Sequence, residues 1–508
     1  ERLEINYLSN QVGDLYFALL TDWLDAEVET ASGDDILLET AALKLNELNL
    51  KYGPTSDGYS RFHVFHRRRL YNEREGKWMG WERKRGKLHE FNKLLLGTGP
   101  TSFIPHPGEL GVTIPNRVRY VVTLDSDTRL AHGAINQLVG TLAHPLNRAR
   151  FDDEKKRVVG GFGILQPRIT PALPSAKDST IFQTLSAGPS GIDPYATAVS
   201  DVYQDLFGEG SFSGKGIYDP RVFEAALAGR IPENTMLSHD LFEGNYARCG
   251  YLSDVEFFED FPSHSEVSAS RSHRWIRGDW QLLPWIFGSQ GNSLPLISRW
   301  KMFDNLRRSL VTPAIFLLLI VSLVSHETFP LPWVILSCLS LMIGTLLSLA
   351  IDLIPRRRNT SQIAHLRSTF QELGIGLERF LLFFSLIPHH AWLNVDAITR
   401  SIVRVFITRR HLLEWTTAAQ ATAAASIQLT SFIRGMSVSL VSVALTLTVC
   451  LVFSPTHALV TLPMFLLWLA SPVVAWKVSS PPVKKLIAPL MPDEILFLHL
   501  TARRIWRF

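Results

Sequence analysis

Cysteine and net charge are both scarce in this chain. Only three of the 508 residues are cysteine (Cys249, Cys338 and Cys450), and their spacing fits no metal site. Three cysteines are too few, and an odd number, for a disulfide framework. We therefore expect reduced, structural thiols. The formal net charge is only +4. A balance this close to neutral argues against a general nucleic-acid-binding protein.

Charge is also almost absent from four long apolar segments, 309–325, 331–354, 435–453 and 458–476. Each approaches the ~20 residues that a helix needs to cross a bilayer. A buried core helix is the alternative for a single segment, but four of them in one part of the chain favour membrane spans. The sequence therefore predicts an α-helical transmembrane region with about four spans.

The basic residues that flank these segments lie on one side of the predicted membrane. They are Arg299, Lys301, Arg307 and Arg308 before the first segment, the arginines at 356–358 after the second, Arg434 before the third, and Lys477, Lys484 and Lys485 after the fourth. The connections SHETFP and SPTH between paired segments contain no lysine or arginine. By the positive-inside rule, the N-terminal domain and residues 355–434 are predicted to be cytoplasmic.

These features divide the chain into three predicted parts. Residues 1–298 form a soluble domain, 299–485 form the membrane region, and 486–508 begin a linker to further domains. Within the membrane region, 372–415 is amphipathic and contains a Pro-His-His break at Pro388. This composition favours interfacial helices over a fifth span.

In the soluble part, strand-like segments end in acidic residues. The segment GDLYFALLTDWLDA contains Asp22 and Asp25 at its end, and RYVVTLDSDTRL runs into Asp125 and Asp127. Helix-like segments such as DDILLETAALKLNELNLKYG lie between the strands. This alternation predicts an α/β fold with a mostly parallel sheet and flanking helices. Ligands bind outside the carboxyl ends of such strands, which is where these acids fall.

The Asp-Ser-Asp sequence at 125–127 suits a divalent cation. Two carboxylates one residue apart can face one ion, and oxygen ligands suit Mg²⁺ or Mn²⁺. Such an ion can bridge the oxygens of a diphosphate. Asp-x-Asp alone is also common in turns and helix caps, and Thr128 is a possible cap residue. Haloacid dehalogenase-type phosphatases have Asp-x-Asp-x-Thr after a strand, but Arg129 stands at that threonine's position here.

Three segments further along the chain carry candidate site residues. Asp240, in LSHDLFEG, precedes an apolar helix-like stretch, where an acid is also favoured by the helix dipole alone. The segment 269–286 gathers arginine and tryptophan: Arg271, Arg274, Trp275, Arg277 and Trp280. Guanidinium groups hold phosphates and indole faces stack on sugars, although an aromatic belt at a membrane interface is the alternative.

Gly214 lies in FGEGSFSGKGIYD, whose glycine spacing does not match a phosphate-binding Walker loop because Gly216 occupies the Ser/Thr position after Lys215. We interpret the segment as a flexible loop over an acceptor, with a surface turn as an equal alternative. The charged segment 63–87 is either a solvated surface segment or, because of its Trp-Met-Trp residues, a packed or sugar-contacting insert.

The order of these features resembles the processive membrane glycosyltransferases of the GT-A fold, such as cellulose and hyaluronan synthases. Those enzymes share an acidic first site, Asp-x-Asp, a catalytic-base Asp and Gln-x-x-Arg-Trp, and here Arg271 stands where their Gln would be. Longer segments are similar to the glycosyltransferase family 84 domain of cyclic β-1,2-glucan synthases: EGKWMGWERKRGKLHEFNKLL, GFGILQPRI, FGEGSFSGKGIYD, LSHDLFEG and SHRWIRGDWQLLPWI. The segment RRHLLEWTTAAQ resembles the stretch that follows that domain.

This resemblance implies a GT-A fold and an inverting glucosyltransferase that uses UDP-glucose and a metal, Mg²⁺ or Mn²⁺, to extend a β-1,2-glucan. It also implies a place in the bacterial inner membrane, in contact with the lipid bilayer. The implied roles are uridine binding for Asp22, phosphate contact for Lys87 with Asn92 nearby, nucleotide and metal binding for Asp125 and Asp127, general base for Asp240, and diphosphate and acceptor contacts for Arg274 and Trp275.

Two departures from the resemblance concern the ends of the chain. The opening ERLEINYLSN has a helical pattern, so Asp22 falls on what should be the second strand, and we expect the first strand of the fold to precede residue 1. In the family, a segment like 486–508 leads to cyclising and phosphorylase-like domains. We therefore expect the chain itself to make a linear glucan at most.

Three other functions remain as alternatives. The first is another processive β-glycan synthase of the cellulose or hyaluronan type. The second is a transporter with a cytoplasmic regulatory domain, which charges deep within the spans would favour, whereas only Asp352, near a segment end, is charged. The third is a glycoside hydrolase that uses Asp125 or Asp127 with Asp240, which would not explain a membrane-tethered cytoplasmic site.

Overall fold

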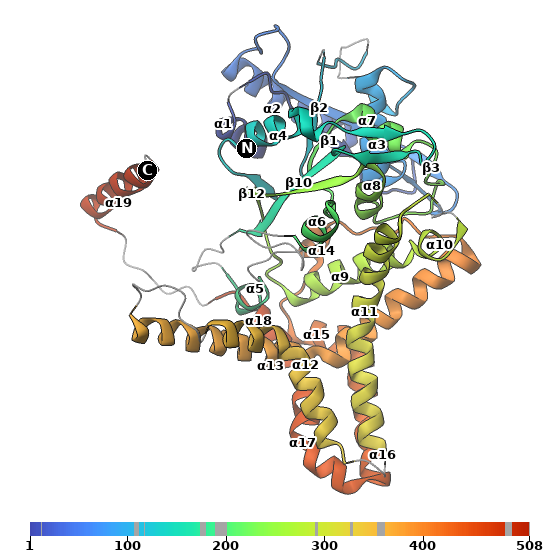
Figure 1. The fold of residues 1–508 in the computed structure, drawn as a ribbon, viewed down its shortest axis with the longest axis vertical. Helices are drawn as coiled ribbons and strands as arrows, with labels where there is room; N and C mark the ends of the chain where they lie inside the picture. Colours follow the sequence, from blue (N-terminus) through green and yellow to red (C-terminus); the bar gives the residue numbers. More distant parts are fainter. Residues whose placement is uncertain are drawn as a thin grey trace.

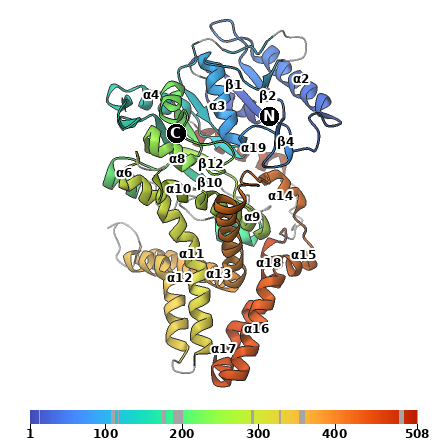
Figure 2. The same ribbon diagram turned by 90° about the vertical axis from the view of Figure 1, so that its right-hand side faces the viewer.

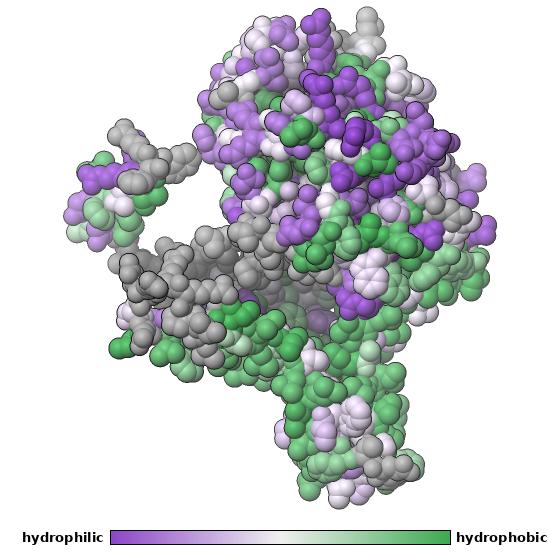
Figure 3. Space-filling view, viewed as in Figure 1, coloured by the Kyte–Doolittle hydropathy of each residue, from purple (hydrophilic) through white to green (hydrophobic). Residues whose placement is uncertain are grey.

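The computed structural model describes residues 1–11, 13–105, 111–115, 117–172, 179–187, 201–289, 293–325, 329–352, 361–482 and 490–506. They form an α/β part and, extending away from it, a narrow bundle of helices that we call the stalk (Figure 1). The surface of the stalk is almost continuously hydrophobic, whereas the α/β part is mainly hydrophilic (Figure 3). The described residues therefore comprise a mixed α/β part and a helical part with an apolar surface.

The N-terminal residues build a three-stranded sheet in the order β1-β2-β5. Its strands are β1 (Phe17–Asp22), β2 (Phe62–Arg67) and β5 (Phe103–Ile104). The helix α1 (Arg2–Ser9) precedes the sheet, α2 (Asp34–Tyr52) lies between β1 and β2, and α3 (Arg83–Leu96) precedes β5. β1 and β2 are parallel, and every residue of β2 is buried. A hairpin of β3 (Leu70–Asn72) and β4 (Lys77–Met79) follows β2. The charged segment 63–87 is therefore a packed strand, hairpin and helix start.

A five-stranded sheet has the order β6-β11-β10-β12-β7. Its strands are β6 (Val121–Thr123), β7 (Thr128–Leu130), β10 (Ile164–Pro171), β11 (Gly216–Tyr218) and β12 (Cys249–Glu259), with a separate hairpin of β8 (Arg150–Asp152) and β9 (Arg157–Gly160). Only β1·β2 and β10·β12 are parallel among the six pairings of the two main sheets. The predicted mostly parallel sheet is therefore wrong, because short strands such as β6, β7 and β11 pair antiparallel with their neighbours.

The five-stranded sheet must curl, because β6 and β7 occupy its two opposite edges. Four inter-strand steps of about 4.8 Å would separate the edges of a flat sheet by about 19 Å. The link from Thr123 to Thr128 spans at most about 18 Å when fully extended. Here it contains a turn, in which the Thr128 amide donates to the Asp125 carbonyl (3.1 Å). The curl places Asp125 and Asp127 between the two edges of the sheet.

The α/β part also contains short helices, some of which carry residues of the site. They are α4 (Ala134–Ala143), the short turn Pro145–Asn147, α5 (Ile181–Ser186), α6 (Val202–Phe207), α7 (Pro220–Leu227), α8 (Asp240–Ala247), α9 (Ser265–Trp280) and α10 (Leu283–Ile286). α7 begins sharply because Pro220 stands in its first turn and the Asp219 carboxylate accepts from the Arg221 amide.

The remaining helices form the stalk and the elements beneath the α/β part. They are α11 (Leu296–Val324), α12 (Leu331–Asp352), α13 (Gln362–Val403) with a π-helical end (Arg404–Thr408), α14 (Ala418–Ala424), α15 (Leu429–Gly435), α16 (Ser437–Phe453), α17 (Pro455–Leu469), α18 (Ser471–Ser479) and α19 (Pro492–Trp506). The stalk consists of α11, α12, α16 and α17, which extend together away from the α/β part (Figures 1 and 2).

Within the described residues, two helices, α11 and α12, are each long and apolar enough to cross a membrane. Two bent pairs, α15–α16 (66°) and α17–α18 (40°), raise the number to four if each pair is one span. The four predicted segments fall on these helices. The flanking basic residues at 356–358 and 484–485 lie outside the described residues.

The boundary predicted at residue 298 falls inside α11. Met302 and Leu306 of this helix are buried in the same core cluster as Phe242 and Trp285 of the α/β part. α11 therefore continues from the α/β core into the stalk without a linker.

The predicted break at Pro388 is absent, because α13 runs through it as one helix of 42 residues. α13 lies crosswise beneath the α/β part and packs against α9 and α11 (Figure 1). The residues from Arg409 to Thr417 are not helical. They return to the α/β part, where Leu413 accepts a hydrogen bond from Arg83 and donates one to Glu75. The described helix α19 lies apart from the rest of the chain (Figure 1).

Candidate active site

Three carboxylates meet where the curled sheet brings strand ends together. Asp125 and Asp127 follow β6, and Glu259 ends β12. One oxygen from each lies within 4.8 Å of the others, so the three can hold one metal ion. Within the described residues, no hydrogen bond or ion pair engages the Asp127 carboxylate. Glu259 was not predicted, although it ends an apolar strand as the other acids do.

Two lysines hold Asp125 from opposite sides. Lys84 Nζ of α3 donates to Asp125 Oδ1 (2.6 Å) and to the carbonyl of Gly214 (3.1 Å). Lys215 Nζ lies 3.2 Å from Asp125 Oδ2 and also pairs with Glu259. Burial alone would raise the pKa of Asp125, but the two ammonium groups outweigh it and hold this pKa well below its usual range. Burial raises the pKa of Glu259, against the opposing effect of Lys215.

The loop predicted to cover the acceptor is buried and runs beside Asp240. Gly214 has a φ of +83°, and a Cβ added there would lie 2.5 Å from Asp240 Oδ1. Asp240 is the first residue of α8. The surface-turn alternative is therefore wrong, because the segment around Gly214 packs between Asp240 and Lys84 and then enters β11. Only glycine leaves room for the Asp240 carboxylate here.

A buried pair lies next to Asp240. His239 Nδ1 is 2.8 Å from Glu243 Oε1 and 3.5 Å from Asp240 Oδ1. Burial lowers the pKa of His239, but the two carboxylates outweigh burial and raise it. Burial raises the pKa of Glu243. These three side chains form a second group whose geometry can hold a metal, and Asp240 Oδ1 and Glu243 Oε2 are buried without a hydrogen-bond partner within the described residues.

Asp22 lies at the end of β1 and is fixed by cations. It accepts a hydrogen bond from Arg67 Nε (2.7 Å) and pairs with Lys87 (3.2 Å). Burial opposes ionisation, but Lys87 and Arg67 together lower the pKa of Asp22. Lys84 and Lys87 both lie in the first turns of α3, so this helix connects Asp22 to the acids around Asp125. The structure thus brings Lys87 to Asp22 and Lys84, which was not predicted, to Asp125.

Two arginines of α9 face the acids. The Arg271 guanidinium lies over the rings of Phe261 (5.1 Å) and Trp275 (4.8 Å). Arg274 donates to the Thr416 carbonyl (2.8 Å) and lies 4.0 Å from the centre of the Trp415 ring. The Nε atoms of both arginines are buried and have no hydrogen-bond partner within the described residues.

The charges around these arginines favour an anion. Burial and the neighbouring Arg271 lower the pKa of Arg274 to about 10, opposed by Asp125 and Asp127. Burial likewise lowers the pKa of Arg271, opposed by Glu259 and Asp127. Buried guanidinium groups with unused donors are well suited to phosphate oxygens.

Three predicted residues are engaged elsewhere. Arg277 donates to the side chain and carbonyl of Glu414 (both 2.9 Å), and Trp280 donates to Ser309 of α11 (2.9 Å). Asn92 is fully buried, where it accepts from the Tyr218 hydroxyl (2.9 Å) and donates to Glu224 (2.8 Å). These contacts fix helices against one another, so the structure does not bring the three side chains to the acids.

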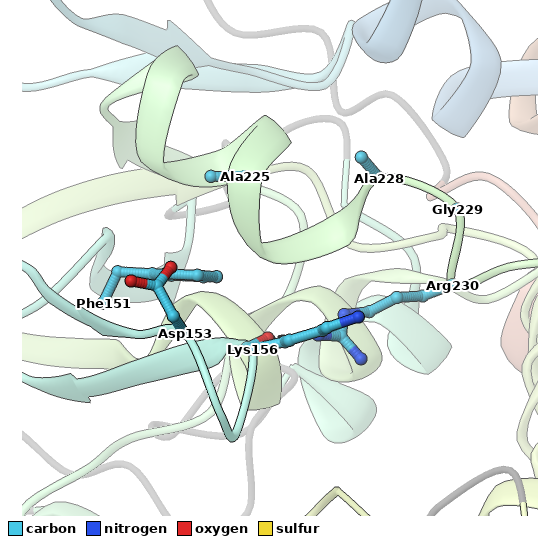
Figure 4. A pocket seen from close by; sticks show the side chains of 7 residues that line it. All are labelled: Phe151, Asp153, Lys156, Ala225, Ala228, Gly229 and Arg230. Atoms are coloured by element: carbon cyan, nitrogen blue, oxygen red, sulfur yellow. Dashed lines mark hydrogen bonds between the residues drawn. The ribbon is translucent and has the colours of Figure 1, made fainter.

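A hollow of about 360 Å³ lies away from these residues, between the β8–β9 hairpin and the end of α7. Figure 4 shows its lining, with Asp153 and Lys156 from the hairpin and Arg230 after α7. None of the predicted site residues lines it.

Comparison with known proteins identifies a relative of the whole chain. Over 507 residues the chain is 44% identical to the cyclic β-(1,2)-glucan synthase NdvB of Rhizobium meliloti (strain 1021). The chain matches one section of this synthase. The match covers all of the chain but only 18% of the length of NdvB. It confirms the resemblance read from the motifs. No protein-family model matches the chain.

The match to NdvB runs through both the α/β part and the helical part. The acidic cluster and the apolar helices therefore correspond to one continuous section of that protein.

Proposed function

We propose that the chain is the glucosyltransferase section of a cyclic β-1,2-glucan synthase, with a GT-A type site that uses UDP-glucose. One observation carries the proposal. In a chain 44% identical to NdvB, the strand-end acids Asp125, Asp127 and Glu259 gather beside Asp240 and face Arg271 and Arg274. The match to NdvB supports a β-1,2-glucan as the product. The arrangement of the acidic and basic residues supports glucosyl transfer from UDP-glucose.

The carboxylates of Asp125, Asp127 and Glu259 fit a hard divalent cation such as Mg²⁺ or Mn²⁺, because all three offer oxygen ligands at compatible distances. A bound cation would offset the charge that develops on the departing diphosphate. Lys84, Lys215, Arg271 and Arg274 surround this position. Their ammonium and guanidinium groups would donate to the phosphate oxygens and orient the donor.

Asp240 is the proposed general base. It takes the proton from the 2-hydroxyl of the acceptor glucose, and the oxygen attacks the anomeric carbon from the face opposite UDP. The bond from that carbon to the diphosphate oxygen breaks, and UDP leaves with the electron pair. A single displacement converts the α-linked donor into a β-1,2 linkage. Gly214 leaves space for the Asp240 carboxylate.

The other predicted residues have positions that support their proposed roles. Asp22 lies at the end of β1 with Lys87 beside it, which suits uridine recognition next to a phosphate contact. Trp275 offers an indole face next to Arg271 for the acceptor sugar. The apolar stalk would hold this site at the cytoplasmic face of the bacterial inner membrane, in contact with lipid. The remaining, cyclising part of the synthase would belong to regions of NdvB beyond this match.

Titration calorimetry of UDP with the purified 508-residue chain tests this proposal. We expect binding that requires Mn²⁺ and falls at least about tenfold in Asp127→Ala, because one charged ligand is lost. Asp153→Ala, in the unrelated hollow of Figure 4, is the matched control and should bind as the wild type does. Metal-independent binding, or equal loss in both variants, would count against the metal–nucleotide site.

A further inference from the structure

A second hollow, of about 250 Å³, opens between α3 and α7 on the far side of α3 from the acids. Arg85, His89 and Lys93 line it and are spaced four residues apart, so they share one face of α3. Lys84 and Lys87 lie on the side of the same helix that contacts Asp125 and Asp22. The hollow is therefore separate from the proposed donor site.

One wall of the hollow is aromatic. Trp81 is half-buried, with the Arg85 guanidinium 5.8 Å from its ring centre and the His89 ring 6.0 Å away at an interplanar angle of 43°. The facing wall is apolar and comes from Phe223, Leu227 and Ile231. Apolar side chains beside an indole ring suit a pyranose ring, whose C–H groups form an apolar face.

Its polar groups include both donors and acceptors. Arg85, His89 and Lys93 supply donors, and Glu224, Glu233 and Glu243 supply carboxylates. Two of these carboxylates already have partners, since Glu224 pairs with His89 (2.6 Å) and Glu243 with His239 (2.8 Å). Arg85 Nε is buried and has no hydrogen-bond partner within the described residues. An anionic ligand would face three carboxylates, whereas a neutral polyhydroxyl ligand can use both kinds of group.

The size of the hollow is below that of pockets for drug-sized ligands, which are about 300–1,000 Å³. We propose that the hollow between α3 and α7 binds one glucosyl unit of a glucan, as a site additional to the acceptor position at Asp240. That the glucan is β-1,2-linked rests on the proposed function. The choice of a neutral sugar rests on the lining alone.

One residue of the lining, Glu243, connects the hollow to the surroundings of the proposed base. The Glu243 carboxylate is 2.8 Å from His239 Nδ1, next to Asp240. A growing glucan held here would stay beside the site between additions.

Saturation-transfer NMR on the 508-residue chain in detergent, with a β-1,2-linked glucose disaccharide as the probe, tests the assignment. We expect Trp81→Leu to weaken binding about three- to tenfold, since it removes the aromatic face but keeps an apolar side chain. Glu233→Gln, at an exposed position, should weaken it by a smaller factor. Trp78→Leu and Glu73→Gln, neighbouring residues outside the lining, are the matched controls and should bind normally.

UDP binding, measured on the same samples, shows that each variant is folded and separates the two proposals. Sugar binding that survives in Trp81→Leu but disappears in Trp275→Leu would place all glucan at the acceptor position and overturn this assignment. A wild type that binds UDP but no disaccharide would also overturn it, while leaving the transferase intact. Disaccharide binding that needs Trp81, in a chain that binds no UDP, would instead refute the transferase.

Discussion

At Gly214 the backbone passes so close to Asp240 that a single methyl group decides whether both fit. We predict that Gly214→Ala lowers glucan synthesis about a hundredfold, because the added carbon would displace the Asp240 carboxylate by about 1 Å. UDP binding should stay within about twofold, since the donor contacts lie on other residues. Initial rates with radiolabelled UDP-glucose, alongside calorimetry, measure the two effects.

Gly58→Ala is the control for backbone strain. Gly58 has a φ of +82°, almost the same as Gly214, but no atom lies within 4 Å of its added Cβ. It should cost about 1 kcal/mol of stability and leave the rate unchanged. Equal rate losses in both variants would show that strain, and not contact with Asp240, is responsible.

Lys84 sets the pH range in which Asp125 is ionised. A carboxylate must be deprotonated to bind a cation, so Mn²⁺ affinity falls as the pH drops through the pKa of that carboxylate. In the wild type, the pKa of Asp125 is held below its usual range by Lys84 and Lys215 against burial. Lys84→Met removes one ammonium group and leaves the burial, so this pKa should rise.

We therefore predict that the Mn²⁺ affinity of Lys84→Met begins to fall at a higher pH than in the wild type. Affinity at about pH 8 should be unchanged or tighter, since Lys84 no longer competes for Asp125. Lys87→Met is the control, because Lys87 pairs with Asp22. Calorimetric titrations between about pH 5 and 8 measure the curves, and parallel curves for Lys84→Met and the wild type would contradict the assignment.

The sequence indicated Asp125, Asp127 and Asp240 as candidates because each follows or begins a recognisable element. It could not locate Lys84, Lys215 or Glu259, since their contacts depend on how far the sheet curls. Curl is set by strand order, and strand order is not visible in the residues of β6 or β7 themselves. Asn92 is the opposite case. It lies on α3 with Lys84, but its side chain points into the interior and contacts Tyr218 and Glu224.

At the scale of elements, α11 is tied to the segment that leads to Gly214. Lys301 of this helix is buried and donates to the carbonyls of Gly210 (2.9 Å) and Glu209 (3.1 Å). It also pairs with the Glu209 carboxylate (3.4 Å). The first long apolar helix thus holds the start of the segment whose end contacts Asp240 and Asp125.

Lys301→Met should lower the stability of the α/β part by about 1–3 kcal/mol, because buried carbonyls lose their donor. Glu209 keeps weaker pairings with Arg157 (3.6 Å) and Arg248 (3.8 Å), which limits the loss. Thermal unfolding in detergent measures it. Lys77→Met, at an exposed lysine, should unfold at the wild-type temperature. An unchanged midpoint for Lys301→Met would show that this anchor contributes nothing.

Element types were more predictable than their pairing. The helices α2 and α4 and the strand that ends at Asp22 follow from local pattern and turn residues. The strand β2 was missed, because its His and Arg residues look solvated in sequence, yet Arg67 is buried between Asp22 and Glu90. The break expected at Pro388 is absent because α13 packs along its length against other helices, which outweighs the local cost of proline.

At the scale of the whole molecule, the distribution of basic residues along the stalk predicts on which side of a membrane the site lies. Arg308 lies in the N-terminal half of α11, and Arg434 lies near the end of α15, just before α16 begins. The connection from α16 to α17 lies at the far tip of the stalk (Figure 1). That connection contains no lysine or arginine. From the positive-inside rule we predict that the tip lies outside the cytoplasm and the acids lie within it.

Thr456→Cys introduces a thiol at this tip, where Thr456 is exposed, and Ser263→Cys introduces one at an exposed position of the α/β part. With a membrane-impermeant maleimide added to intact bacterial spheroplasts, we expect labelling of Thr456→Cys only. Ser263→Cys should react only after the membrane is permeabilised. The unsubstituted chain is the blank, since Cys249 and Cys450 are buried and Cys338 lies within α12. Labelling of Ser263→Cys in intact cells would place the acids outside the cytoplasm, where nucleotide sugars are absent, and would remove the basis for the proposed transferase.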